Sequence, residues 1–312
     1  MGLTLPRHRI EMATAGRTPR PDAELAAWLE LHREEALEPE IPICDAHHHL
    51  WSRPESAWPG MQKQLHMGSR FQTRYELHDL GRDIASSGHN VVDTVYEECN
   101  SNYHSTGPEE LRSLGETTFA QRCHDANEIP GTNVAAAIVG AVDLVSLGAR
   151  AGGVLQQHMD AAPNFRGIRQ AHALDPELGT THAREGVSGS AILTDPDFRA
   201  GFKCLGDLGL CFDAWGFFHQ LQPVAELADA FPDTQIVLNH AGGPLGLGSY
   251  ANRQASVLAE WKAGIDVVSA CPNVSVKLGG CCKPLSNPGQ WHLLDRPRTS
   301  VEIADALGPY YQ

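Results

Sequence analysis

The chain has 312 residues, of which 42% are hydrophobic and 20% charged, an ordinary composition for a globular protein of one large domain or two small ones. The formal net charge of −14, without any basic stripe, argues against a nucleic-acid partner. No apolar run is long enough to span a membrane, and residues 1–18 lack the apolar core of a secretory signal. The eight cysteines are scattered, so free thiols in a reducing cytoplasm are the simplest interpretation.

The first 40 residues are expected to form an N-terminal arm ahead of the main domain, which we place at residues 41–312. Pro19 and Pro21 interrupt this arm, and residues 23–36 have the apolar spacing of a short amphipathic helix. We expect the arm to cover one end of the domain or to contact a neighbouring subunit, which leaves a homo-oligomer open.

The rest of the chain alternates short apolar runs with helix-like segments. Strands are expected at residues 41–44, 90–97, 134–142, 165–170, 210–218, 234–238 and 273–278. Helices are expected at residues 77–87, 111–126, 143–158, 195–208, 223–231, 257–270 and 300–307. This alternation predicts an α/β fold with a parallel sheet covered by helices. A closed barrel of the TIM type needs eight strands and only seven are found, so the pattern also allows an open doubly wound sheet.

Three consecutive histidines follow the first apolar run. Alternate side chains of a strand point to the same face, so His47 and His49 are expected to face one side and His48 the other. Neutral imidazoles are good ligands for a borderline cation such as zinc, so this pair predicts a divalent metal site. A long loop rich in aromatic residues follows Trp51 and is expected to form a lid or pocket wall.

Other ionisable side chains also stand where expected strands end. Glu97 follows the second strand, Arg169 the fourth, His219 the fifth and His240 the sixth. In a parallel barrel such residues converge over one mouth. Histidines can move protons near neutral pH, and a guanidinium matches a substrate carboxylate. A structural role is open for each of three residues: Arg169 could pair with an internal carboxylate, Glu97 could be solvated, and His219 could pack on aromatic rings.

Four segments together resemble the amidohydrolase-related proteins, which are metal-dependent hydrolases with a TIM barrel. The segments are residues 45–51 (DAHHHLW), 165–169 (FRGIR), 237–244 (VLNHAGGP) and 273–280 (NVSVKLGG). The branch is similar to the lactonases of sugar acids and dicarboxylic acids. The resemblance runs from about residue 41 to the end of the chain, and the first and third segments in this order carry most of its specificity.

The resemblance implies a role for each matching residue. His47, His49 and His240 are implied metal ligands, with zinc the implied metal, although some lactonases of this branch polarise the carbonyl with histidines alone. His240 and His219 are implied catalytic residues, and Arg169 and Glu97 are expected to bind substrate. The family's eighth strand carries an aspartate that has no counterpart here, since neither Asp295 nor Asp305 follows an apolar strand. We therefore expect a C-terminally truncated barrel with the eighth strand missing.

The leading interpretation is a cytoplasmic enzyme that hydrolyses a small carbonyl compound, most simply a lactone. One alternative is a decarboxylase, because related barrels use the same histidines to release carbon dioxide from unsaturated acids. The other is an inactive fragment that lacks the aspartate of the eighth strand. Assays of lactone opening and of carbon dioxide release distinguish the first two.

Overall fold

The computed structural model describes residues 22–52, 74–176, 179–180, 189–280, 286 and 291–311. Its centre is a parallel sheet of seven strands that follow one another in chain order across the sheet. The strands are β1 (Pro42–His48), β4 (Asn90–Glu97), β5 (Asn133–Gly140), β6 (Phe165–Ala171), β9 (Cys211–Trp215), β10 (Ile236–Leu238) and β11 (Val274–Val276). The predicted α/β fold with seven barrel strands is confirmed.

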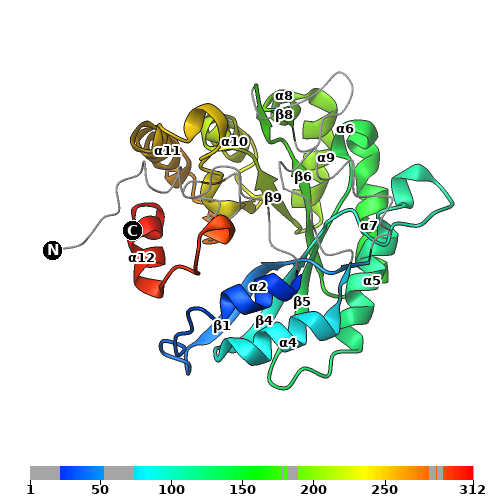
Figure 1. Cartoon of the computed structure of the whole chain (residues 1–312). Helices are drawn as coiled ribbons and strands as arrows, with labels where there is room; N and C mark the ends of the chain where they lie inside the picture. Colours follow the sequence, from blue (N-terminus) through cyan, green and yellow to red (C-terminus); the bar gives the residue numbers. More distant parts are fainter. Residues whose placement is uncertain are drawn as a thin grey trace.

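Helices surround the curved sheet in Figure 1. They are α2 (Asp22–Leu29), α4 (Leu77–Ser87), α5 (Leu114–Asp125), α6 (Leu144–Leu147), α7 (Ala151–Ala161), α8 (Ala191–Thr194), α9 (Pro196–Asp207), α10 (Leu221–Ala230), α11 (Gln254–Ser269) and α12 (Ser300–Tyr311). Two short antiparallel ribbons lie outside the main sheet: β2 (Trp51–Ser52) pairs with β3 (Arg74–Tyr75), and β7 (Leu174–Asp175) pairs with β8 (Gly179–Thr180). None of the described helices has the length and hydropathy to cross a membrane.

The sheet does not close on itself within the described residues. β1 and β11 are its two edges, and each is hydrogen-bonded to one neighbouring strand, β4 and β10 respectively. Apolar side chains are correspondingly accessible on both edge strands, with Ile43 36% and Val276 46% exposed. The central strands are covered on both sides, as expected of a parallel sheet.

The core lies between the sheet and its helices. Phe198 and Phe202 on α9 pack on Phe212 of β9, with ring centroids 5.7 and 5.2 Å apart. All three side chains are fully buried. Burying a phenylalanine side chain contributes about 1.5–3 kcal/mol, so these rings hold α9 firmly against the sheet.

The described part of the N-terminal arm packs on the C-terminal segment of the chain. Trp28 of α2 is buried and donates a hydrogen bond from Nε1 to the carbonyl oxygen of Leu294, at 2.8 Å. The backbone N–H of Ser300, where α12 begins, donates to Glu34 Oε2 at 2.7 Å. The expectation that the arm covers one end of the domain stays a prediction. The domain boundary at residue 40 stays a prediction.

The prediction of one continuous helix over residues 143–158 is wrong. The structure divides this segment into α6, a short 3₁₀ turn (Gly148–Arg150) and α7. The division falls at Gly148, whose φ of 53° lies in the left-handed region, which residues with a Cβ atom avoid. Asp143 is the N-cap of α6, because its side chain accepts a hydrogen bond from the Ser146 N–H.

Candidate active site

The three consecutive histidines lie as the alternation of a strand requires. The rings of His47 and His49 are in contact, with centroids 4.9 Å apart. His48 is directed to the other side, where its Nε2 is 2.9 Å from Thr94 Oγ1 on β4. His48 is buried, and burial lowers its pKa to about 4, so it is a neutral core residue. His47 and His49 are therefore the pair available to the mouth of the sheet.

His240 joins this pair from the far half of the sheet. It follows β10, and its ring centroid lies 4.5 Å from that of His47 and 4.6 Å from that of Trp215. Its φ is 53°, and that of Ala241 is 49°. Two consecutive non-glycine residues in the left-handed region store conformational strain, which persists only where surrounding structure fixes it. Three imidazoles from two separated stretches of sequence thus meet at one point.

Arg169, at the end of β6, connects the histidines to two buried carboxylates. Its Nε donates to Glu98 Oε1 at 2.7 Å and is 3.4 Å from Glu97 Oε1, while Nη1 is 3.4 Å from His47 Nε2. Burial alone would lower the pKa of Arg169, but the Glu98 and Glu97 carboxylates outweigh it and raise the pKa. Arg169 is therefore a permanently charged group whose charge is already largely compensated within the protein.

A second buried cation stands on the other side of Glu97. Lys277, the residue after β11, places Nζ 2.7 Å from Glu97 Oε2 and 2.5 Å from Asp213 Oδ2. Glu97 is fully buried, and burial followed by repulsion from Asp213 raises its pKa to about 8, against the opposing effect of Arg169 and Lys277. Glu97 Oε2 is also 3.7 Å from His47 Nδ1. Glu97 therefore joins the imidazoles to both cations.

The segment after β4 that carries Glu98 is held by a carboxylate from α5. Glu116 Oε1 accepts hydrogen bonds from the backbone N–H of Cys99 at 2.9 Å and of Ser101 at 3.1 Å, and from the Tyr96 hydroxyl at 3.0 Å. Burial, and then the charge of Glu98, raise the pKa of Glu116 to about 7. This bracing fixes Glu98 and, through it, Arg169.

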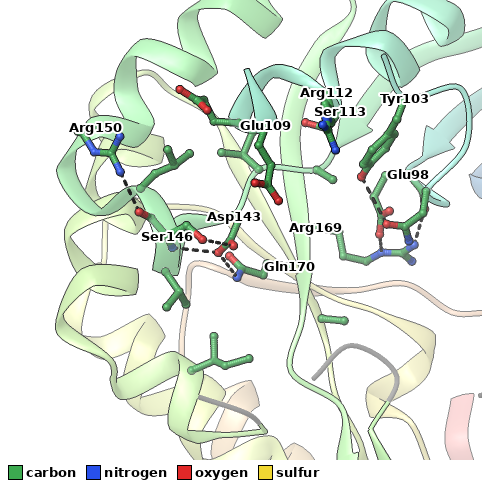
Figure 2. Close-up of a pocket in the computed structure, with 18 residues that line it drawn as sticks. Glu98, Tyr103, Glu109, Arg112, Ser113, Asp143, Ser146, Arg150, Arg169 and Gln170 are labelled. Carbon is green, nitrogen blue, oxygen red and sulfur yellow. Dashed lines mark hydrogen bonds and ion pairs between the residues drawn. The ribbon is translucent and has the colours of Figure 1, made fainter. Parts of the chain in front are cut away.

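A cavity of about 760 Å³ opens beside Arg169 (Figure 2). Its lining combines apolar side chains such as Val142 and Ala171 with polar and charged ones. Figure 2 shows Glu109, Asp143 and Gln170 around the middle of the cavity, with Arg169 and Glu98 at one end. The lining contains four carboxylates and three guanidinium groups, namely Glu98, Glu109, Glu110, Asp143, Arg112, Arg150 and Arg169. The cavity is therefore mixed in charge, and Arg169 belongs both to it and to the histidine cluster.

His219, which the sequence places after the fifth strand, lies apart from this cluster. His219 is exposed; its Nε2 is 3.1 Å from the carbonyl oxygen of Leu174, and its ring contacts are with Phe217 and Phe218. The geometry gives no support to the catalytic role expected of it, because these partners belong to its own turn and to β7. His172 is buried, and burial lowers its pKa to about 4. The expected lid falls mostly on residues 53–73, which lie outside the described residues.

The predicted metal site can be tested against the arrangement of the donors. His47, His49 and His240 offer the ring nitrogens that zinc accepts. As the side chains lie, however, no three His, Cys, Asp or Glu residues in the described part of the chain are grouped so that they could hold a metal ion. Arg169 approaches His47 Nε2, and Lys277 takes an oxygen of Glu97. These donors do not fit a metal without rearrangement, so metal binding stays a prediction.

Two residues of the cluster were missed by sequence reasoning. Asp213 stands inside the apolar strand β9, and Lys277 follows a strand that is partly exposed. A carboxylate between Phe212 and Ala214 indicates a buried ion pair, because a buried charge requires a partner. The sequence alone does not say that this partner is Lys277, 64 residues away.

Comparisons with known proteins place the chain beside one group of enzymes. The sequence profile described as "Amidohydrolase" matches residues 44–309. The chain is 28% identical over 250 residues to the protein y4mH of Sinorhizobium fredii, an alignment that covers 77% of this chain and 73% of that protein.

The fold is similar to that of a solved structure. An amidohydrolase from Burkholderia multivorans, solved once with HEPES and once with zinc bound, superposes with a TM-score of 0.55 at 20% identity over 86% of this chain and 79% of that one. A probable 2-pyrone-4,6-dicarboxylic acid hydrolase from Acinetobacter baumannii, with citric acid bound, has a TM-score of 0.41 at 12% identity over 87% of this chain and 92% of that one.

Proposed function

This chain belongs to the amidohydrolase family, and from that premise we propose that it hydrolyses the lactone of a sugar acid. The observation that carries the proposal is the meeting of His47, His49 and His240 in ring contact, beside an arginine that also lines a polar cavity. Imidazoles clustered in this way suit the polarisation of a carbonyl group, and the cavity has room for the rest of the substrate.

The charge of the cavity favours a sugar lactone over a dicarboxylic one. A dianionic substrate would need uncompensated positive charge, whereas Arg169 is already paired with Glu98 and Glu97. The lining as a whole has one more carboxylate than guanidinium groups. Carboxylates and amides such as Glu109 and Gln170 accept or donate hydrogen bonds to hydroxyl groups, which a sugar lactone supplies in number.

In the proposed reaction the lactone carbonyl lies against the three imidazoles. The N–H group of His240 donates a hydrogen bond to the carbonyl oxygen and stabilises the negative charge that develops there as water attacks. The rings of His47 and His49 flank this position; His47 Nε2 faces Arg169 Nη1, and the His49 Nδ1–H donates to the carbonyl oxygen of Glu97 at 2.8 Å. The second ring nitrogen of His240 takes a proton from the attacking water and delivers it to the ring oxygen when the ring C–O bond breaks, which yields the open hydroxy acid. Glu97 Oε2, 3.7 Å from His47 Nδ1, orients the His47 ring. No step is routed through a metal, because the donors do not fit one as they lie.

The test is a panel of sugar-acid lactones and dicarboxylic lactones, with ring opening followed by a pH indicator and carbon dioxide measured in parallel. We expect ring opening of sugar lactones, lowered about 100-fold or more by His240→Ala. His219→Ala serves as a matched control, since His219 lies apart from the cluster and should retain activity. Release of carbon dioxide without ring opening would replace the proposal with a decarboxylase. A preference for dicarboxylic lactones would overturn the choice of substrate.

A further inference from the structure

The ion pair of Lys277 spans the interior of the curved sheet. Lys277 follows β11 at one edge of the sheet, whereas Glu97 ends β4, the neighbour of the opposite edge strand. Its second partner, Asp213, comes from β9 and also accepts a hydrogen bond from the Asn239 side chain at 2.8 Å. One ammonium group therefore joins three strands that are distant in sequence and in sheet order.

The two carboxylates need this cation. Glu97 and Asp213 have at most 1% of their surface exposed, so water cannot neutralise them. Two buried carboxylates that share one site repel each other, as the raised pKa of Glu97 reflects. Buried charges persist in proteins when they are paired or when they bind a metal. Here the pairing is supplied by a side chain of the same protein.

A divalent metal would compete directly with Lys277. Carboxylate oxygens are the hard ligands that would add to the histidines of a metal centre. Glu97 Oε2 lies 2.7 Å and Asp213 Oδ2 lies 2.5 Å from Nζ, so a metal ion that took both oxygens would have to displace the ammonium group. Arg169 also hinders a metal ion from binding His47 Nε2, because its Nη1 faces that nitrogen.

We propose that the Lys277 ammonium is the resident cation of this site and occupies the electrostatic position that a divalent metal would otherwise take between Glu97 and Asp213. The inference rests on the proposed function only in that it places these residues in an active site. Lys277 is a positioning residue: it fixes Glu97, and through Glu97 it fixes the orientation and charge of His47. It follows that the chain works without an added metal.

The experiment is a calorimetric titration of zinc chloride into the chelator-treated full-length chain, with no substrate present. We expect wild type to bind no single zinc ion stoichiometrically. Lys277→Met should gain one zinc site per chain, with an affinity at least about tenfold higher, because Asp213 then loses its ammonium partner and Glu97 keeps only Arg169. Lys277→Arg keeps a cation and should behave as wild type. Lys203→Met is the matched control, since Lys203 is exposed and forms its ion pair with Asp207 on the surface.

Folding and activity are read separately from zinc binding. Circular dichroism verifies each variant, and Lys277→Gln replaces Lys277→Met if the methionine variant does not fold. One tightly bound zinc ion per chain in wild type, or equal zinc affinity in wild type and the neutral variants, would overturn the proposal. If zinc binding follows the expectation but no lactone is opened, the proposed function fails and the inference about Lys277 stands.

Discussion

At the scale of single residues, the position of His240 depends on a glycine from another segment. A Cβ atom on Gly280 would lie 2.1 Å from His240 Nδ1, which no relaxed structure allows, and the φ of Gly280 is 72°. The His240 ring, whose position follows from the strained backbone at His240 and Ala241, thus occupies a space that only a glycine at position 280 leaves open. The His240 ring therefore lies close against Gly280 on one side and contacts the Trp215 ring on another.

Gly280→Ala should therefore displace the His240 ring. A shift of about 1 Å in a reacting group can cost about 100-fold in rate, and we expect a loss of that order in kcat/KM for lactone opening. The adjacent Gly279→Ala is the control, because a Cβ atom there meets no atom within 4 Å. Steady-state kinetics of the two variants provide the measurement. Equal activity of both would show that Gly280 does not position His240.

Buried histidines distant from the site should make stability depend on pH. Burial lowers the pKa of His158 on α7 to about 4, while Thr117 Oγ1 lies 2.8 Å from its Nδ1. Below pH 6.5 the unfolded chain binds a proton that the folded chain refuses, so stability falls with pH until about pH 4. Between pH 7.5 and 5.5 this histidine alone should cost about 1.4 kcal/mol.

The check is urea unfolding of wild type and His158→Gln at both pH values. The variant should lose less stability than wild type as the pH falls, whatever its stability at pH 7.5. His78→Gln, at a side chain that is 58% exposed, should keep the wild-type pH dependence. A wild-type slope in His158→Gln would mean that other groups account for the acid sensitivity.

At the scale of secondary-structure elements, local signals predicted boundaries well where a residue type has one clear preference. The predicted bounds of α4 and β4 match the structure. Asp195 and Pro196 begin α9 as expected, with Asp195 Oδ1 accepting from the backbone N–H of Asp197 and Phe198, each at 2.9 Å. The break at Gly148 was not predicted, because glycine in a helical pattern signals only a weakened helix.

Removal of this cap tests how strongly α9 depends on it. Asp195→Ala should lower the free energy of unfolding by about 1 kcal/mol, since two N–H groups at the start of α9 lose their acceptor. Asp195→Asn keeps an oxygen in the same place and should lose a few tenths of a kcal/mol at most. Urea denaturation followed by circular dichroism measures both. A cap of no consequence would leave the two variants equally stable.

The candidate site divides in the same way between local and long-range information. Strand ends identified His47, Glu97, Arg169 and His240, because parallel strands bring their carboxyl ends to one edge. The partners of these residues depend on sheet order and side-chain direction, which periodicity does not encode. His219 follows an apolar run too, yet it turns outward on a short 3₁₀ segment. The pairing of Glu97 with Arg169 and Lys277 therefore could not be predicted without the fold.

At the scale of the whole molecule, the arrangement of the edges matters most. β11 has three residues and, within the residues that the structure describes, is hydrogen-bonded to β10 on one side only. Lys277 directly follows its last residue, so part of the candidate site is attached to a short edge strand. The remaining polar groups of the site come from β1, β4, β6 and β9 and from the turn after β10.

Because a short strand bonded on one side is the first part of a sheet to fray, local opening at β11 should withdraw the ammonium group before the core melts. Enzymatic activity should then be lost at a lower urea concentration than the far-ultraviolet circular dichroism signal. The two denaturation curves should have separate midpoints. Coincident curves would mean that β11 unfolds only together with the rest of the sheet. In this protein the resistance of enzymatic activity to denaturant would be set by local opening of β11 and not by the global free energy of unfolding.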